Sequence, residues 1–255
     1  MMRALAVAAA LLIAGGCSQP VQLSSRGGEL DAQVPGELFK PDGPGPFPAV
    51  VVLHGCNGVG PNQYTWARRL NRWGYVAIIV DSFTSRGFSD GVCGKGSLVP
   101  PDVRARDAYA AASWLRSQPF VDAKHVGVIG FSHGGWTVMH AVLEPVVRTA
   151  AATPFQAAVA YYPYCEPGLA RLASDTLILI GDTDDWTPAT RCTAYVTAQL
   201  DQPHSLDIKV YPGAYHAFDA PGAPRTYFGH MLGYHPSAAE DSFAMTRAFF
   251  DARLK

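Results

Sequence analysis

The sequence predicts a single α/β domain in which a mostly parallel, twisted sheet carries helices on both faces. Short apolar runs rich in valine and isoleucine alternate with helix-like segments along the chain. Such runs are typical of strands that a parallel sheet buries on both faces. The length of 255 residues suits one core, and no internal repeat or linker divides it.

The expected elements follow one another in alternation. Strands are expected at 49–53, 75–80, 126–129, 157–162, 176–180 and 206–211. Helix-like spacing of apolar residues marks 63–73 and 102–116. The final helix is expected to open at a capping box between Ser237 and Glu240. Strands that alternate with helices imply right-handed crossovers and a doubly wound sheet.

The charge balance excludes several classes of partner. The 20 basic residues nearly cancel the 21 acidic ones, for a net charge of −1. No basic field therefore indicates nucleic acid or an anionic membrane surface as a partner. Hydrophobic residues make up 48% and charged residues 16%, which favours a compact globule over a disordered chain.

The first residues are typical of an export signal. Arg3 precedes the apolar run 4–14, which is too short to span a bilayer, and small residues precede Cys17. The segment resembles a bacterial lipoprotein signal, so we expect a signal peptide over 1–16, lipidation of Cys17, a tether over 17–27 and the domain over 28–255. The expected location is the periplasm, with membrane attachment only through the lipid anchor. An ordinary signal peptide cleaved nearby is the alternative.

Four further cysteines remain after Cys17, namely Cys56, Cys93, Cys165 and Cys192. Four cysteines in an exported chain allow two disulfides in three pairings. We predict the pairs Cys56–Cys93 and Cys165–Cys192, because each would join segments at neighbouring strand ends. Free buried thiols are the alternative. The chain has no C-x-x-C motif, so a zinc knuckle or thioredoxin-type site lacks support.

The stretch VGVIGFSHGGWTVM, residues 126–139, places a serine between an expected strand and an expected helix. A serine hydroxyl attacks well only when a base reaches it, so its oxygen must stand clear of the sheet. A tight strand-to-helix turn achieves this and requires small neighbours, here Gly130 and Gly134, with additional room at Gly135. This G-x-S-x-G pattern predicts a nucleophile elbow with Ser132 as the nucleophile.

An acid and a base are expected later in the chain, in that order. The expected strand 176–180 runs into GDTDDWTP, where Asp182, Asp184 and Asp185 are candidates for the acid. We choose Asp184 because it lies four residues before Pro188, where hydrolases with such a sheet usually carry the acid, with Asp185 as the alternative. His216 follows the last expected strand and is the expected base. These partners belong to the α/β-hydrolase arrangement.

The tetrahedral intermediate of such a reaction needs two N–H donors. We expect the amide of His133, directly after the nucleophile, and that of Cys56 in the motif LHGCNG. No histidines show H-E-x-x-H or comparable spacing, so we do not expect a metal hydrolase.

The motifs together resemble the dienelactone hydrolase family of α/β-hydrolases. LHGCNG, GYVAIIVDSFTSRG, VIGFSHGG, LILIGDTDDWTPA and YPGAYHAFD occur in the family's order. The resemblance implies an α/β-hydrolase fold, a triad on Ser132, Asp184 and His216, and hydrolysis of a carboxylic ester or lactone without a metal or organic cofactor. Two departures favour a serine esterase over a true dienelactone hydrolase: residue 132 is serine where the enzymes that give the family its name have cysteine, and Gly55 stands where they carry glutamate.

We therefore expect a serine hydrolase that forms an acyl-serine intermediate on a small ester or lactone. Acyl transfer or peptide hydrolysis by the same triad is one alternative, and a non-catalytic envelope binding protein is another. The segment 219–236, rich in aromatic residues and glycine, is expected to form a wall of the pocket. Within it Arg225 is a candidate for contacting a substrate carboxylate, although its position in the loop favours a plain surface role.

Overall fold

The computed structural model describes residues 18–255 apart from 29, 169, 200 and 201. The expected signal peptide over 1–16 and the expected lipidation site Cys17 therefore lie outside the described residues. Within the described range, no helix has both the length and the apolar character that a membrane crossing requires.

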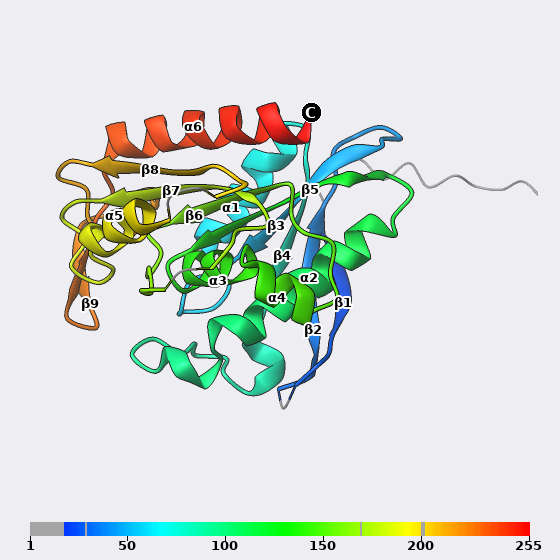
Figure 1. The fold of residues 1–255 in the computed structure, drawn as a ribbon, viewed down its shortest axis with the longest axis horizontal. Coiled ribbons are helices and arrows are strands. Elements are labelled where there is room, and N and C mark those ends of the chain that lie inside the picture. The colour runs from blue at the N-terminus through cyan, green and yellow to red at the C-terminus, as the bar shows by residue number, and fades with distance from the viewer. Residues whose placement is uncertain (1–17, 29, 169, 200–201) are drawn as a thin grey trace, which may run out of the picture.

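An eight-stranded sheet forms the centre of the molecule (Figure 1). Its strands, in spatial order, are β1 (Gln19–Ser25), β2 (Ala32–Phe39), β4 (Val76–Val80), β3 (Phe47–Leu53), β5 (Val121–Phe131), β6 (Ala157–Tyr161), β7 (Asp175–Gly181) and β8 (Leu206–Tyr211). From β4 to β8 all neighbours are parallel, whereas β2 is antiparallel to both β1 and β4. All six expected strands are present, and the mostly parallel sheet confirms the predicted fold class.

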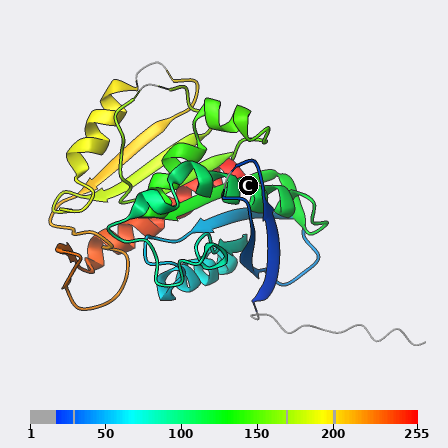
Figure 2. The same ribbon diagram turned by 90° about the horizontal axis from the view of Figure 1, so that it is seen from below.

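Helices cover both faces of this sheet (Figures 1 and 2). They are α1 (Pro61–Arg72), α2 (Pro101–Arg116), α3 (His133–Ala141), α4 (Glu144–Thr149), α5 (Ala189–Ala198) and α6 (Pro236–Leu254), with 3₁₀ turns η1 (Thr84–Arg86) and η2 (Gly96–Leu98). Helices α1 and α6 lie on one face, while α2, α3 and α5 lie on the other. The arrangement is that of a doubly wound sheet.

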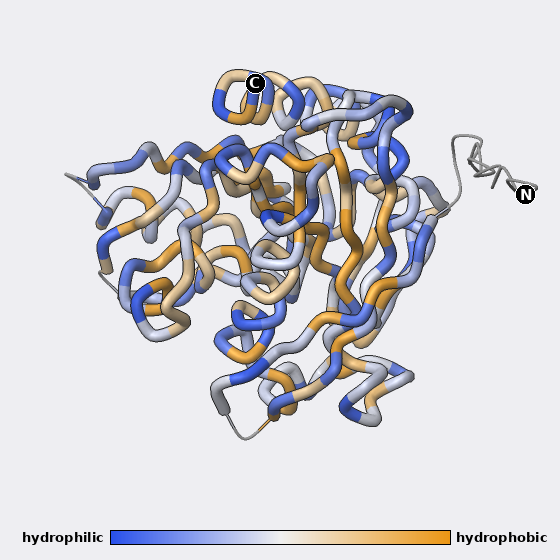
Figure 3. Tube along the Cα trace, turned by 90° about the vertical axis from the view of Figure 1, so that its right-hand side faces the viewer, coloured by the Kyte–Doolittle hydropathy of each residue, from blue (hydrophilic) through white to orange (hydrophobic). Residues whose placement is uncertain are grey.

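The central strands are buried because both of their faces carry apolar side chains. In β4 all five residues, VAIIV, are buried, and so are the last five of β3. The hydropathy of the chain follows this division, with apolar strands inside and polar segments outside (Figure 3). Trp66 of α1 is fully buried, and its ring lies 5.4 Å from that of Phe131 and 5.3 Å from that of Phe243. It therefore joins α1 to the sheet and to α6.

Two sequence expectations need correction. Strand β1 lies inside the segment 17–27 that was expected to be a tether, because Leu23 and Ser25 are buried there and β1 pairs with β2 along its whole length. The final helix also begins before the expected capping box. Its N-cap is His235, whose side chain accepts a hydrogen bond from the Ala238 amide, and Pro236 supplies the first helical residue.

A second, two-stranded sheet follows the last parallel strand. It consists of β9 (Arg225–Tyr227) and β10 (His230–Leu232), an antiparallel hairpin at one end of the molecule (Figure 1). A single parallel bridge between His216 and Leu232 connects the hairpin to the loop after β8. The hairpin thus lies beside the carboxyl ends of the parallel strands, where ligand sites occur in sheets of this type.

Candidate active site

Ser132 stands between β5 and α3, at the tight turn that the sequence predicts. Its φ of 55° and ψ of −115° are sterically unfavourable for a residue with a side chain. Main-chain hydrogen bonds on both sides hold it there: the Ser132 amide donates to the Tyr161 carbonyl at 3.0 Å, and the Ser132 carbonyl accepts from the Trp136 amide at 2.8 Å. The backbone around the serine is thus fixed with its hydroxyl clear of the sheet.

The neighbouring glycines are required by close backbone contacts. A Cβ atom on Gly130 would lie 2.1 Å from the carbonyl oxygen of Gly134, and one on Gly134 would lie 2.4 Å from the carbonyl oxygen of Leu53. A Cβ on Gly135 would lie 2.7 Å from the carbonyl oxygen of Tyr161. No side chain fits at these distances, so the three glycines let α3 pack directly onto the strand ends.

The structure brings the predicted base and acid to the serine. His216 Nε2 lies 2.9 Å from Ser132 Oγ, and His216 Nδ1 lies 2.7 Å from Asp184 Oδ2. His216 and Asp184 are 2% and 3% exposed, so little water competes for these contacts. With the Nδ1 proton donated to the carboxylate, Nε2 is left as an acceptor facing the hydroxyl. The ring of Tyr162 lies 4.7 Å from the imidazole and supports it from one side.

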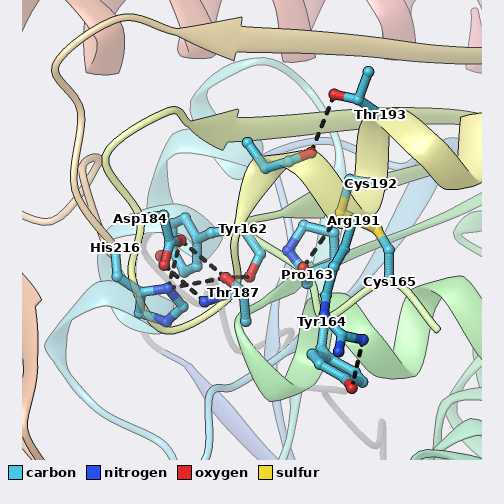
Figure 4. The surroundings of a disulfide bond; sticks show 11 residues. Tyr162, Pro163, Tyr164, Cys165, Asp184, Thr187, Arg191, Cys192, Thr193 and His216 are labelled. Atoms are coloured by element: carbon cyan, nitrogen blue, oxygen red, sulfur yellow. Dashed lines mark hydrogen bonds and ion pairs between the residues drawn. A yellow bond between two sulfur atoms is a disulfide. The ribbon is translucent and has the colours of Figure 1, made fainter.

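Asp184 is held by four hydrogen bonds, and Figure 4 shows it beside Thr187 and His216, which donate three of them. Its Oδ1 accepts from the amides of Trp186 at 3.0 Å and Thr187 at 2.8 Å. Its Oδ2 accepts from His216 Nδ1 and, at 2.9 Å, from the hydroxyl of Thr187. Both oxygens are therefore fully used, and the carboxylate cannot rotate without losing main-chain partners.

The two other aspartates of this segment have different partners. Asp182 accepts from the Gly213 amide at 2.7 Å and stabilises the turn between strands. Asp185 accepts from the Met231 amide at 3.1 Å and lies 3.6 Å from His230 Nδ1. Among the three candidates, only the carboxylate of Asp184 contacts the imidazole of His216 in the described part of the chain.

The two expected oxyanion donors belong to the segments after β3 and after β5. His133 opens α3, so its amide is one of the main-chain N–H groups that a helix N-terminus leaves without a helical partner. Cys56 follows the end of β3 and lines the same cavity as Ser132. Between β3 and Cys56 lies Gly55, where an added Cβ would stand 3.7 Å from the Cβ of Ser132. Gly55 thus occupies, beside Ser132, the position for which the sequence comparison above noted a glutamate in the cysteine-dependent enzymes.

Both predicted disulfides are present. Cys56 is bonded to Cys93 and Cys165 to Cys192, with Cα–Cα separations of 4.8 and 5.0 Å. The first anchors the loop 87–96 to the expected oxyanion segment, an attachment strengthened by a 2.7 Å hydrogen bond from the amide of residue 92 to the Cys56 carbonyl. The second joins the segment after β6 to α5, close to Asp184 (Figure 4).

Ser132 and His216 face a cavity of about 530 Å³, a size typical of small-molecule sites. The beginning of α1 and the loop before it contribute amide side chains, including Asn57, Asn62 and Gln63. Trp186 and Tyr227 form an aromatic wall on the other side. Among the described residues, no acidic side chain lines the cavity.

The segment 219–236 forms one wall of this cavity, as expected, and it does so through the β9–β10 hairpin. Arg225 lines the cavity and is largely exposed to solvent. The indole of Trp186 stacks on the ring of His230 at 4.8 Å and thereby fixes the hairpin. At its tip Phe228 is 59% exposed. The wall is therefore attached through side chains that take no part in holding Asp184.

Two residues of this site were not singled out from the sequence. The Thr187 hydroxyl contacts the acid and the imidazole and also lies 3.1 Å from the Tyr162 carbonyl. Asp219 is buried and accepts from Trp66 Nε1 and Tyr162 Oη at 2.7 Å each, and from Asn62 at 3.1 Å. Their positions within the motifs DTDDWTP and YHAFD could have drawn attention to them, but neither motif indicates which residues these side chains contact in the fold.

Metal coordination finds no support in the described part of the chain, where no three histidine, cysteine, aspartate or glutamate side chains are arranged to hold an ion. Several histidines form ion-pair contacts with carboxylates instead. His140 contacts Glu166 at 2.8 Å, and His204 contacts Asp175 at 3.1 Å.

The sheet order, the strained serine turn and the Ser–His–Asp contact define an α/β-hydrolase. The chain belongs to the dienelactone hydrolase family, whose model matches residues 34–254. This membership places it among the carboxylic ester hydrolases.

Individual relatives agree with the family assignment. A Synechocystis protein provisionally named carboxymethylenebutenolidase is 25% identical over 242 residues, which cover 88% of this chain and 93% of that one. A dienelactone hydrolase-like promiscuous phosphotriesterase from metagenomic libraries has a TM-score of 0.75 at 24% identity, covering 94% of this chain and all of that one. A propionate-bound esterase of Thermogutta terrifontis has a TM-score of 0.70 at 15% identity, with 92% and 94% coverage. The two structures share the fold.

Proposed function

We propose that this protein cleaves a carboxylic ester or lactone through an acyl-serine intermediate. The observation that carries the proposal is the 2.9 Å contact between Ser132 Oγ and His216 Nε2, with Asp184 on the opposite ring nitrogen and a substrate-sized cavity in front. A serine that merely capped a helix would need neither the strained backbone nor a buried imidazole whose second nitrogen is already occupied.

In the first half-reaction, His216 Nε2 takes the hydroxyl proton while Ser132 Oγ attacks the carbonyl carbon. The carbonyl π electrons move to oxygen, and the amides of Cys56 and His133 stabilise the resulting oxyanion. Asp184 stabilises the imidazolium that forms. The intermediate then collapses: the bond to the leaving alkoxide breaks, the imidazolium gives that oxygen its proton, and the acyl group remains on the serine.

In the second half-reaction, water replaces the alcohol. The imidazole removes a proton from the water as its oxygen attacks the acyl carbon, and the second oxyanion occupies the same pair of amides. Collapse releases the carboxylic acid and returns the proton to Ser132. For a lactone, the alcohol and the acid are the two ends of one product, so ring opening follows from the same steps.

The test combines chemical labelling with turnover. Purified mature protein is incubated with p-nitrophenyl acetate and, separately, with a fluorophosphonate, and the adduct is located by peptide mass spectrometry. We expect ester hydrolysis and a single adduct on Ser132, with both lost in Ser132→Ala. Ser205→Ala, which removes a serine hydroxyl outside the cavity, serves as the matched control. A folded wild-type protein inert to both reagents would refute the proposal.

We also propose that the protein acts outside the cytoplasm, anchored by a lipid on Cys17. The two disulfides support this location, because such bonds persist in oxidising compartments. Replacement of Cys17 with serine should move the protein from the membrane to the soluble fraction of cells that express it. Unchanged fractionation would contradict the lipid anchor.

A further inference from the structure

Arg104 of α2 is a fully buried cation behind the site, with 0% exposure. Its Nη1 lies 2.8 Å from His133 Nδ1, and its Nη2 donates to the His54 carbonyl at 2.8 Å. His133 opens α3 and His54 directly follows β3. One guanidinium therefore joins the two segments that carry the proposed oxyanion amides.

The hydrogen-bond partners of this guanidinium are unusual for a buried cation, because they do not include a carboxylate. Asp107, one turn along α2, accepts two hydrogen bonds from Arg86 at 2.8 Å each. Arg104 instead lies over the ring of Phe83 at 4.9 Å, and its Nε has no partner among the described residues. Burial of a cation without a directly bonded carboxylate costs several kcal/mol. A contact that costs stability and lies behind a reactive site indicates a functional role.

The two histidines that Arg104 joins have assigned and complementary protonation. His54 Nε2 accepts from the Ser82 amide at 3.1 Å, which leaves Nδ1–H to donate to the Gly55 carbonyl at 2.7 Å. His133 Nδ1 accepts from Arg104, which leaves Nε2–H to donate to the Gly96 carbonyl at 3.0 Å. Burial, reinforced by the guanidinium, lowers the pKa of both rings, that of His133 to about 3. Both rings are therefore neutral at working pH, as these contacts require.

We propose that Arg104 is a positioning residue that sets the separation between the oxyanion amides of Cys56 and His133. The inference rests on the proposed function. A guanidinium is a rigid, planar fork, so its two N–H groups fix the His54 carbonyl and the His133 ring relative to each other. Displacement of a catalytic group by about 1 Å can cost about 10²-fold in rate.

The test measures the rate per competent site. Titration with a fluorophosphonate counts reactive serines, and kcat on p-nitrophenyl acetate is divided by that count. For Arg104→Met we expect a decrease of about 10²-fold in kcat per site and in the rate of phosphonylation, with KM changed less than threefold. Arg104→Lys keeps the charge but not the fork, so we expect it to recover at most about tenfold of this loss.

Arg116→Met provides the matched control. Its guanidinium also donates to two main-chain carbonyls, those of Ala123 at 3.3 Å and Pro154 at 2.9 Å, but it lies outside the active-site cavity. We expect its rate per titrated site to stay within about threefold of wild type, even where the fraction of folded protein falls.

A second variant keeps the inference testable if Arg104→Met does not fold. His133→Phe removes the same contact from the other end and retains a planar ring beside Phe83 and Trp136. We expect kcat per titrated site to decrease at least tenfold in His133→Phe. In the double variant with Arg104→Met, we expect less than a threefold further decrease.

The outcomes separate this inference from the proposed function. Rates per site within threefold of wild type in Arg104→Met or in His133→Phe would overturn the positioning role alone. A wild-type protein that reacts with neither the ester nor the fluorophosphonate would overturn the proposed function, and this inference with it.

Discussion

Replacement of Asp184 with asparagine tests the geometry of the site with the smallest change in volume. In the wild-type protein the amides of Trp186 and Thr187 donate to Oδ1. An asparagine carbonyl oxygen must occupy that position, because an NH₂ group there would face two N–H donors. The NH₂ group is therefore forced toward His216, in place of the oxygen that now accepts from Nδ1.

The size of the expected decrease in kcat follows from the imidazole tautomer. Facing an NH₂ donor, Nδ1 becomes an acceptor and the ring proton moves to Nε2, which then cannot take the proton of Ser132. Loss of the correct tautomer in a triad of this kind costs about 10⁴-fold in kcat, or about 5.4 kcal/mol of transition-state stabilisation. The Thr187 hydroxyl can accept from the new NH₂ group and donate to the Tyr162 carbonyl, 3.1 Å away. We therefore expect little loss of stability.

The assay compares kcat for p-nitrophenyl acetate with thermal unfolding for each variant. Asp185→Asn is the matched control, because that carboxylate contacts Met231 and His230 instead of the imidazole of His216. We expect its kcat to stay within about threefold of wild type. More than a tenth of wild-type activity in Asp184→Asn, or an equal loss in Asp185→Asn, would refute the assignment of the acid.

Three further predictions concern the surroundings of the site. Loop-closure entropy assigns about 4 kcal/mol to each disulfide, for sequence separations of 37 and 27. Cys93→Ala and Cys192→Ala should therefore lose similar free energies of unfolding in urea, whereas only Cys93→Ala should lower kcat. Equal kcat values in the two variants would contradict this prediction. The depressed folded-state pKa of His133 means that its stability contribution is complete above about pH 6.5 and is lost as pH falls toward 3. His133→Phe should therefore flatten the pH dependence of the unfolding free energy by about 1.4 kcal/mol per pH unit between pH 6 and 4, and an unchanged slope would argue against a buried neutral ring. Arg225→Gln should raise KM about three- to tenfold for esters whose acyl group carries a carboxylate and leave neutral esters unaffected; equal effects on both would indicate a plain surface role.

The placement of Ser132, Asp184 and His216 was predictable from local sequence because each of these positions has a local requirement. The strained turn at Ser132 needs glycine on both sides, and the structure shows why at Gly130 and Gly134. Five of the six expected strands were continuous apolar runs, which are typical of a buried parallel sheet, while the sixth, 206–211, alternates between polar and apolar residues. The positions of Asp184 and His216 followed from strand ends, since parallel strands place their carboxyl ends at one edge.

Elements without such local requirements were missed. Strand β1 is half polar, and β2 contains Pro35 and Gly36, which conceal its alternation. Gly36 is small because Leu23 and Ile78 approach it closely, with their side chains 3.2 Å from an added Cβ. That reason lies in neighbouring strands and not in the segment itself. The same holds for Arg104, since a basic residue in a helix is ordinarily a solvent-exposed one.

The attachment of the β9–β10 hairpin has a consequence for how substrate range can change. The hairpin is held by side-chain contacts among Trp186, His230 and Asp185 and by the main-chain bridge between Leu232 and His216. An exchange of 225–229 for a segment of another length or composition would thus remodel the entrance and keep the contacts that His230, Met231 and Leu232 make with the site. Divergent copies of this scaffold have a ready route to new acyl preferences, and protein engineers have a defined segment to graft.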